Sequence, residues 1–177
     1  MKPWIFSFLL LAAFAASGQE MSDKNVSETE MFSRQAGLLL EKQFVDIGMV
    51  KGVEIKVFKV KDLLSGKSVS SIRFEYTVRT AYTSDTKTAV IDSDEIDGLI
   101  KSIKAMQNDV FPTSRDVYTE VVFISRTGVV CGAYYDLEKR RWTPFLDIDK
   151  YRKATVFLTL GDMETFLGFI ETAKTKM

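Results

Sequence analysis

A strand-to-helix unit that occurs twice in the chain constrains the fold more than any other feature of the sequence. The first copy runs from Thr88 to Gln107 as a short apolar strand, an acidic segment and an amphipathic helix. Alignment of Ala89 with Val156, an offset of 67 residues, superimposes every apolar position of the two helices: Ile96, Leu99, Ile100 and Ile103 on Met163, Phe166, Leu167 and Ile170. Self-similarity at a fixed spacing sets the architecture before any local assignment. We therefore expect two similar halves.

An acidic or polar segment joins strand and helix in both copies. Asp92 followed by Glu95 has the form of a capping box, which satisfies free backbone N–H groups at the start of a helix. The corresponding segment of the second copy is Thr159 to Asp162. The carboxylates of Asp92, Asp94, Glu95 and Asp97 could also bind calcium, but they lack the glycine and distal glutamate of an EF-hand loop. We therefore assign them to helix capping and predict no metal site.

The first residues have the pattern of a secretory signal peptide. Lys2 precedes an apolar run from Trp4 to Ala16 and a small-residue zone, Ser17-Gly18-Gln19. We predict cleavage after Gly18, with Ala15 or Ala16 as competing sites and an uncleaved anchor as the alternative. Residues 1–18 are then the signal peptide and residues 19–27 a flexible N-terminus. The product is predicted to be exported, periplasmic or extracellular, without a membrane anchor after cleavage.

The remaining elements follow from periodicity and turn residues. We predict a helix from Glu28 to Gln43, with Ser27 as its cap, and a C-terminal helix over 162–174. Strands are predicted over 52–61, 70–80, 86–92, 117–126, 129–136, 142–148 and 153–160. The strand 70–80 alternates apolar and polar residues, which indicates a sheet with one wet face. Val121 to Ile124 is apolar on both faces and is therefore predicted to be a central strand.

These elements predict an α+β fold of two tandem antiparallel-sheet-plus-helix repeats packed as one domain. The domain covers 28–177, with repeat halves of about 44–107 and 117–175. Each helix is expected to cover the apolar face of its own sheet. Neither half is large enough to form a good core alone.

The composition excludes several kinds of catalytic site. The sequence has no histidine, which removes Ser-His-Asp and Cys-His arrangements and histidine-bound zinc. Its 24 basic and 24 acidic residues provide no overall field to attract nucleic acid. The single cysteine, Cys131, is interpreted as a buried apolar residue; the alternative is a nucleophile activated by Arg126 or Lys139. No cofactor is predicted.

Two sets of residues are candidates for a functional site. Lys139, Arg140, Arg141 and Trp142 form the only basic run, and with Arg73 and Arg79 they are the predicted ligand-binding residues. A second set, Asp92, Asp136, Asp147 and Asp149, could serve a carboxylate-based hydrolase if two members faced each other across a cleft.

The two strand-to-helix units, 89–103 and 156–170, give the chain a resemblance to the Whirly and PUR-type single-strand nucleic-acid binders, whose tandem repeats consist of antiparallel strands closed by a helix. The resemblance implies a sheet fold that binds single-stranded nucleic acid, and it assigns no functional residue. The chain also resembles small exported bacterial proteins of unknown function.

Our first hypothesis is a non-enzymatic binding or accessory protein of the bacterial envelope, with an unknown protein or small-molecule ligand. The alternatives are a histidine-independent carboxylate hydrolase and a single-stranded nucleic-acid binder. The export signal and the balanced charge argue against nucleic acid.

Overall fold

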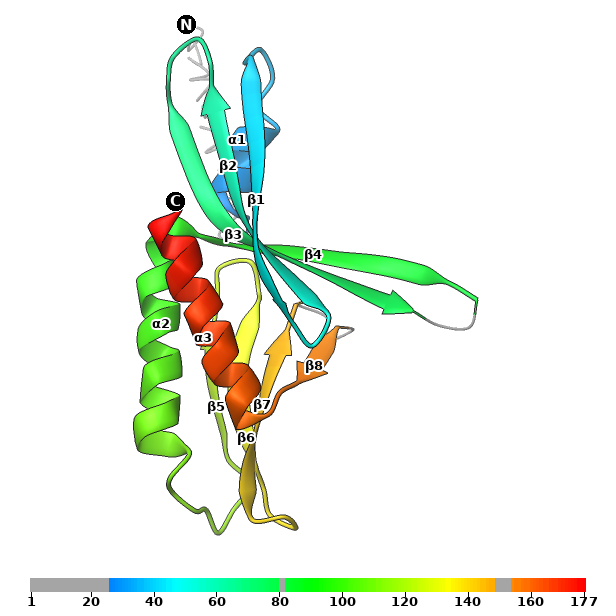
Figure 1. Ribbon diagram of the computed structural model, residues 1–177, viewed down its shortest axis with the longest axis vertical. Coiled ribbons are helices and arrows are strands. Elements are labelled where there is room, and N and C mark those ends of the chain that lie inside the picture. Colours follow the sequence, from blue (N-terminus) through cyan, green and yellow to red (C-terminus); the bar gives the residue numbers. More distant parts are fainter. Residues whose placement is uncertain (1–25, 80–81, 149–153) are drawn as a thin grey trace, which may run out of the picture.

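The computed structural model describes residues 26–79, 82–148 and 154–177, which form an α+β fold (Figure 1). The predicted signal peptide, 1–18, and most of the segment 19–27 lie outside the described residues. The end of that segment is described, and Ser27 is fully buried there.

The described strands form two four-stranded antiparallel sheets, each in simple sequence order. The first sheet consists of β1 (Leu40–Val50), β2 (Val53–Asp62), β3 (Ser68–Arg79) and β4 (Ser84–Asp92). The second consists of β5 (Glu120–Ile124), β6 (Val130–Asp136), β7 (Arg141–Asp147) and β8 (Thr155–Phe157). The helical elements are α1 (Glu28–Ser33), the 3₁₀ turn η1 (Ser93–Glu95), α2 (Ile96–Ala105), the π-turn η2 (Met106–Val110) and α3 (Leu160–Thr175).

The predicted repetition is present in the order of the elements, because each sheet of four strands is followed by one long helix. Of the four matched apolar positions in each helix, Ile100 is half-buried and the other seven are buried. One hydrophobic cluster joins residues of both sheets and both helices. None of the helices in the described ranges is long and apolar enough to span a membrane.

The positions of α2 and α3 differ from the prediction. The two helices lie side by side over one face of the second sheet (Figure 1). Helix α2, which follows the first sheet, packs against β6, and α3 packs against β1 and β2 as well as β7. The expectation that each helix covers only its own sheet is therefore wrong. Phe169 of α3 occupies the space beside Gly48 in β1, where a Cβ atom would lie 2.5 Å from its ring.

The predicted helix from Glu28 to Gln43 is also wrong beyond its first turns. Helix α1 ends at Ser33, Gly37 has a φ of +81°, and β1 begins at Leu40. The near-helical apolar spacing that predicts the helix runs from Met31 to Phe44, but the residues from Leu40 onward pair with β2. The tight turn at Lys51 and Gly52, both with positive φ, directs β1 onto β2. Strand pairing has overridden the local helical pattern.

The strand containing Val121 to Ile124 is an edge strand, contrary to the prediction. Strand β5 pairs only with β6 among the described strands. Val121 and Phe123 face the helices, whereas Val122 and Ile124 lie on the opposite face with 41% and 63% of their surface exposed. The prediction assumes that a strand with two apolar faces has both of them covered by other elements, but helices pack on only one face of this sheet.

Candidate functional site

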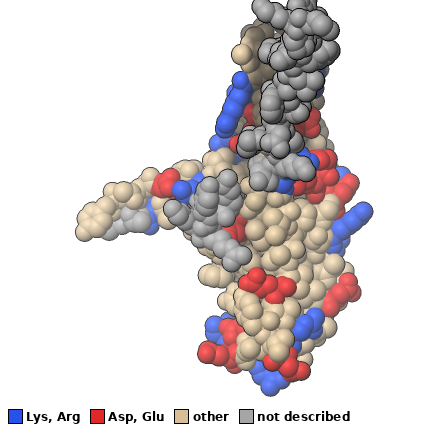
Figure 2. Space-filling model, turned by 180° about the vertical axis from the view of Figure 1, so that it is seen from behind, with Lys and Arg blue, Asp and Glu red and all other residues tan. Residues whose placement is uncertain are grey.

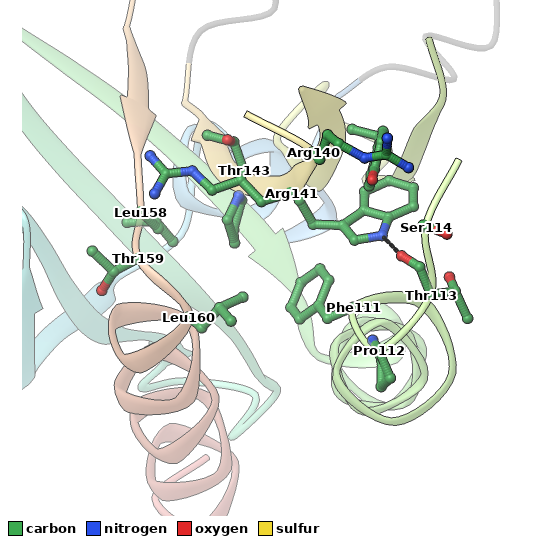
Figure 3. Close-up of a pocket in the computed structure, with 13 residues that line it drawn as sticks. Phe111, Pro112, Thr113, Ser114, Arg140, Arg141, Thr143, Leu158, Thr159 and Leu160 are labelled. Carbon is green, nitrogen blue, oxygen red and sulfur yellow. Dashed lines mark hydrogen bonds between the residues drawn. The ribbon is translucent and has the colours of Figure 1, made fainter. Parts of the chain in front are cut away.

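A cavity of about 430 Å³ lies beside the turn between β6 and β7 (Figure 3). We call it the hairpin cavity. It is lined by three segments: the connector after η2, strands β6 and β7 with their turn, and the start of α3. The lining residues are Phe111, Pro112, Thr113, Ser114, Tyr135, Arg140, Arg141, Trp142, Thr143, Pro144, Leu158, Thr159 and Leu160.

Trp142 is a fixed wall of the hairpin cavity. Its side chain is buried, and its indole N–H donates a hydrogen bond of 2.8 Å to the backbone carbonyl of Thr113. The guanidinium of Arg115 lies over its ring at 5.4 Å, and Tyr135 meets it edge to face at 5.4 Å. The hydrogen bond satisfies the indole N–H, which usually has a partner when a tryptophan is buried. Together these contacts fix the position of the indole.

In the turn between β6 and β7, Lys139 has a different role from Arg140 and Arg141. Asp136 accepts hydrogen bonds from the backbone N–H groups of Glu138 and Lys139, and it forms an ion pair of 3.0 Å with the Lys139 ammonium. These interactions, the Lys139 N–H bond first, hold the pKa of Asp136 below its ordinary value. Lys139 therefore stabilises the turn and does not line the cavity.

Arg140 and Arg141 both line the hairpin cavity, as Figure 3 shows. Neither guanidinium forms an ion pair with any carboxylate in the described parts of the chain, and no carboxylate is among the lining residues. Arg140 adopts a φ of +51° at the turn, which directs the chain from the hairpin tip into β7. The cavity therefore combines an aromatic wall with two cationic groups that no described acidic side chain neutralises.

The structure does not bring Arg73 and Arg79 to this cavity. Both belong to β3 in the first sheet, whereas the β6–β7 turn forms the opposite end of the molecule (Figure 1). Arg73 donates to Glu75 at 2.5 Å and lies over the ring of Phe44 at 5.6 Å. It belongs to the predicted polar face of the first sheet, where Lys56 also pairs with Glu75. The six predicted ligand-binding residues thus divide between two places, and only Arg140, Arg141 and Trp142 form part of one cavity.

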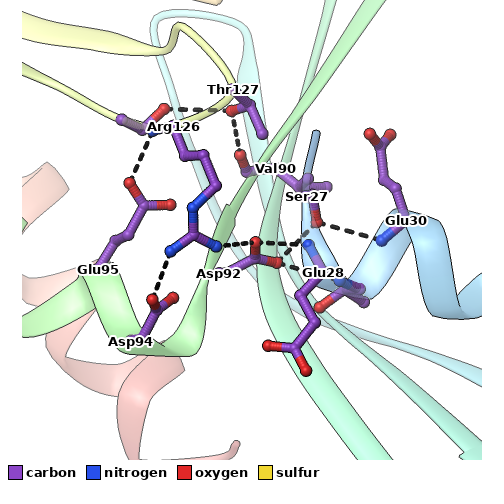
Figure 4. Close-up of polar contacts among 11 residues, drawn as sticks. Ser27, Glu28, Glu30, Val90, Asp92, Asp94, Glu95, Arg126 and Thr127 are labelled. Carbon is purple, nitrogen blue, oxygen red and sulfur yellow. Dashed lines mark hydrogen bonds and ion pairs between the residues drawn. The ribbon is translucent and has the colours of Figure 1, made fainter. Parts of the chain in front are cut away.

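Asp92 is the centre of a polar cluster that joins three distant segments (Figure 4). Its carboxylate accepts hydrogen bonds from the Ser27 hydroxyl at 2.6 Å and from the backbone N–H groups of Glu28 at 2.8 Å and Thr29 at 3.3 Å. Arg126, in the turn between β5 and β6, donates to it at 3.0 Å. The side chain of Asp92 is 3% exposed. It therefore fixes the start of α1 to the end of β4.

The predicted capping box at Asp92 and Glu95 is not formed. Asp92 makes no side-chain hydrogen bond to the helix that follows it, and Glu95 accepts from the backbone N–H of Arg126 at 2.7 Å. Arg126 also pairs with Asp94 at 2.5 Å, and that interaction is the main cause of its raised pKa. The carboxylates are close enough together to suggest a cation site. Arg126 offsets part of their negative charge through its ion pairs with Asp92 and Asp94, and its backbone N–H binds Glu95, so each carboxylate already has a partner within the chain.

The carboxylates proposed for hydrolysis do not form a catalytic pair. Asp136 and Asp147 belong to opposite ends of the β6–β7 ladder, because Asp136 pairs with Arg141 and Asp147 pairs with Val130. The seven-residue strand β7 separates these ends by roughly 20 Å, whereas glycosidase carboxylates lie about 5–10 Å apart. Both oxygens of Asp92 are occupied by the contacts above, and Asp149 lies outside the described residues.

Cys131 is a buried apolar residue, as its sequence context predicts. Burial raises the pKa of its thiol to about 12. Its sulfur lies 4.0 Å from the sulfur of Met163 in α3. The proposed activating groups are committed elsewhere, since Arg126 pairs with Asp92 and Lys139 pairs with Asp136. A thiolate nucleophile is not available here at neutral pH.

Sequence reasoning missed the other wall of the hairpin cavity. The segment after η2 carries no chemical motif in the sequence, yet its Phe111 and Thr113 face Trp142 and complete the cavity. Pro112 is typical of a turn, and nothing in the local pattern indicates which strand that turn contacts.

Comparison with known proteins gives no match to this chain among protein-family models, curated proteins or solved structures.

Proposed function

We propose that this protein is a non-enzymatic binding protein of the bacterial envelope that holds an anionic ligand with an apolar body in the hairpin cavity. The observation that supports this most is the combination of Arg140 and Arg141 with the aromatic wall of Trp142, in a cavity to whose lining the described residues contribute no carboxylate. The proposal retains the binding role expected from the sequence and adds a ligand class.

The size and lining of the hairpin cavity support a small-molecule ligand. Ligand sites typically enclose about 300–1,000 Å³ and combine apolar walls with a few polar groups that orient the ligand. Here Phe111, Trp142 and Leu160 provide apolar surface, and Arg140 and Arg141 provide positive charge. Guanidinium groups bind carboxylates, sulfonates and phosphates through paired hydrogen bonds.

The environments of the candidate catalytic residues support a binding function rather than an enzymatic one. Asp92 is enclosed by its hydrogen-bond donors, Asp136 stabilises a turn, and Cys131 is buried with a raised thiol pKa. A general acid or base must reach its substrate, and a nucleophilic thiol must be ionised. These three residues do not meet those conditions.

The envelope location in this proposal rests on the N-terminal pattern of Lys2 and the apolar run from Trp4 to Ala16. N-terminal sequencing of the protein recovered from a bacterial periplasm or culture medium would test it. We expect the mature chain to begin at Gln19. Recovery of the chain only from the cytoplasm, with the residues before Gln19 still attached, would contradict export.

Binding can be tested with a matched pair of fluorescent probes, the anion 8-anilinonaphthalene-1-sulfonate and its uncharged parent, N-phenyl-1-naphthylamine. A Trp4→Phe background leaves Trp142 as the only tryptophan, so its quenching reports on the hairpin cavity. We expect the anion to bind more tightly than the neutral probe. Arg140→Ala and Arg141→Ala should each weaken anion binding about tenfold, because each removes one charge-assisted contact.

Lys139→Ala is the control for this experiment. It removes one positive charge from the same turn but from a side chain that does not line the cavity. Its affinity for the anion should stay close to that of the parent protein. Equal losses in all three variants would indicate a general charge effect, and no loss in either arginine variant would refute the proposed site.

A further inference from the structure

Strand β5 has one edge to which no described strand pairs. Its pairing with β6 continues beyond the strand ends, with hydrogen bonds from Tyr135 N–H to the Thr119 carbonyl and from Ser125 N–H to the Val129 carbonyl, both 2.9 Å. Alternate residues of an antiparallel strand bond to the same neighbour. Residues 119, 121, 123 and 125 therefore face β6, and Glu120, Val122 and Ile124 direct their backbone N–H and C=O groups away from the sheet.

The other sheet edges carry more features that oppose pairing with another strand than β5 does. Edge strands are usually protected by charged residues, bulges, proline or short length. The outer strand β1 has Glu41, Lys42 and an irregularity between Asp46 and Gly48, and β8 has only three residues. The exposed part of β4 contains Asp85 and polar neighbours.

By contrast, β5 consists of Glu120, Val121, Val122, Phe123 and Ile124, with a single charge and no proline or glycine. Val122 and Ile124 are exposed on the face that has no helix. The Val122 side chain leans toward β6, since one of its methyl groups would lie 2.7 Å from a Cβ atom on Gly132. It therefore leaves the outer edge of the strand accessible.

The face next to this edge is also apolar. Tyr134 has ring contacts with Tyr118, Phe145 and Phe157, and Tyr118 and Phe157 are more than half exposed. Figure 2 shows the molecule from behind, with a broad area of uncharged side chains in the middle of the view and a patch of acidic side chains between that area and the charged lower end. Helix α2 packs on the opposite face of the sheet, against β6 and, at Gly98, beside the ring of Phe123 in β5.

We infer that the outer edge of β5 pairs with β5 of a second copy of this chain, antiparallel and about a twofold axis at Val122. In this register Val122 lies opposite Val122 of the second copy, and Glu120 lies opposite its Ile124. The outward N–H and C=O groups of Glu120, Val122 and Ile124 then all find partners. The β5–β8 sheets of the two copies become one continuous sheet. The interface is isologous, as is usual for dimers.

Charge favours the antiparallel arrangement over the parallel one and allows a second copy as partner. The two Glu120 carboxylates are separated by four residues along the strand, or about 13 Å, which exceeds the screening length of about 8–10 Å at physiological salt. Parallel pairing in register would place them about 5 Å apart and is disfavoured. The chain has equal numbers of acidic and basic residues, so two copies do not repel each other overall.

The mass in solution tests this pairing, measured by light scattering during size-exclusion chromatography over a series of protein concentrations. The wild-type mass should approach twice the monomer mass as concentration rises. Val122→Lys places two ammonium groups opposite each other and should weaken the dimer tenfold or more. Thr86→Lys, on the outer edge of β4, is the control and should leave the dimer unchanged. A wild-type protein that remains monomeric at every concentration would overturn the inference.

A crosslinking experiment tests the register and does not depend on the lysine variant being folded. In an antiparallel hydrogen-bonded pair the Cα atoms lie about 5.5 Å apart, within the range for a disulfide. Val122→Cys should therefore form an intermolecular disulfide under mild oxidation, while Thr86→Cys should not. The native Cys131 is buried and does not compete. Equal crosslinking of the two variants would contradict pairing through β5.

Discussion

At the scale of single residues, Asp92 shows how far a correct local signal can predict structure. Its position at the end of a strand and before a helix was read from the sequence, and that position is confirmed. Its partners were not predictable, because Ser27 is 65 residues away and Arg126 is 34 residues away. A capping pattern describes only what one helix needs. Four other donors, the Ser27 hydroxyl, two backbone N–H groups of α1 and the Arg126 guanidinium, bind the same carboxylate instead.

Removal of Asp92 should therefore destabilise the protein more than removal of its exposed neighbour. Asp92→Ala leaves the Ser27 hydroxyl, two backbone N–H groups and Arg126 without their acceptor. We expect a loss of about 3 kcal/mol in the free energy of unfolding. Asp94→Ala, which removes a mostly exposed partner of the same arginine, should cost less than about 1 kcal/mol. Urea unfolding would measure both, and equal losses would contradict the central role of Asp92.

The same cluster predicts the effect of chelators. Because Arg126 already forms ion pairs with both Asp92 and Asp94, an added excess of a calcium chelator should leave the melting temperature unchanged. A decrease in melting temperature that is restored by calcium would show that an ion binds here in spite of the arginine.

At the scale of elements, the equivalent residues of the two strand-to-helix junctions have different roles. At the start of α3, Thr159 accepts from the backbone N–H of Asp162 at 3.1 Å, and Asp162 accepts from the N–H of Thr159 at 2.8 Å. This is a complete capping box. At the equivalent junction before α2, Asp92 and Glu95 bind α1 and the β5–β6 turn. Asp162 also has a distant partner, the Lys51 ammonium at 3.4 Å, but its capping hydrogen bonds with Thr159 are retained. At the junction before α2, by contrast, the distant donors take the place of the capping hydrogen bonds.

The closed capping box should give a defined pH dependence. Its hydrogen bonds, that from the Thr159 hydroxyl first, hold the pKa of Asp162 below its ordinary value. A carboxyl whose pKa is lower in the folded state stabilises the fold above its unfolded pKa of about 4, and this contribution disappears as pH falls through the folded value. The difference in melting temperature between wild type and Asp162→Asn should therefore be largest near neutral pH. It should decrease as the pH falls below about 4 and disappear once the pH is below the pKa of the folded state. A difference that stays constant down to strongly acidic pH would refute this assignment.

Prediction of elements succeeded where periodicity and burial agree. Strand β3 alternates as predicted, with Ile72 and Phe74 buried and Arg73 and Glu75 on the polar face. It failed for β1, whose helical spacing was overridden by pairing with β2, and for β5, whose apolar faces are not both covered. In both failures the deciding contact lies on another strand. A pattern within one segment therefore could not reveal it.

At the scale of the whole molecule, the position of the helices makes one core from two sheets. Helix α3 contacts β1, β2 and β7, and α2 contacts β6 and α3. The sequence predicted the two halves and their order, but amphipathic spacing specifies only that a helix has an apolar face. It does not specify which sheet that face will cover. The hairpin cavity was likewise only partly predictable, because its walls come from three segments.

This arrangement predicts that the two halves unfold together. In the Trp4→Phe background, the fluorescence of Trp142 reports on the second half, and far-ultraviolet circular dichroism reports on both sheets. Because one hydrophobic cluster spans both halves, the two signals should give the same urea midpoint. Two separated transitions would show that the halves are independent domains.

The crossed packing of α2 and α3 also bears on how such a chain could have originated. A single unit of four strands and a helix would leave uncovered the surface that the other unit's helix now occupies. If the two halves descend from one duplicated gene, their ancestor could not have folded alone with these contacts. It would have required a second molecule to supply the crossing helix. Fusion of two such units would then have turned an association that depends on concentration into a permanent one within a single polypeptide.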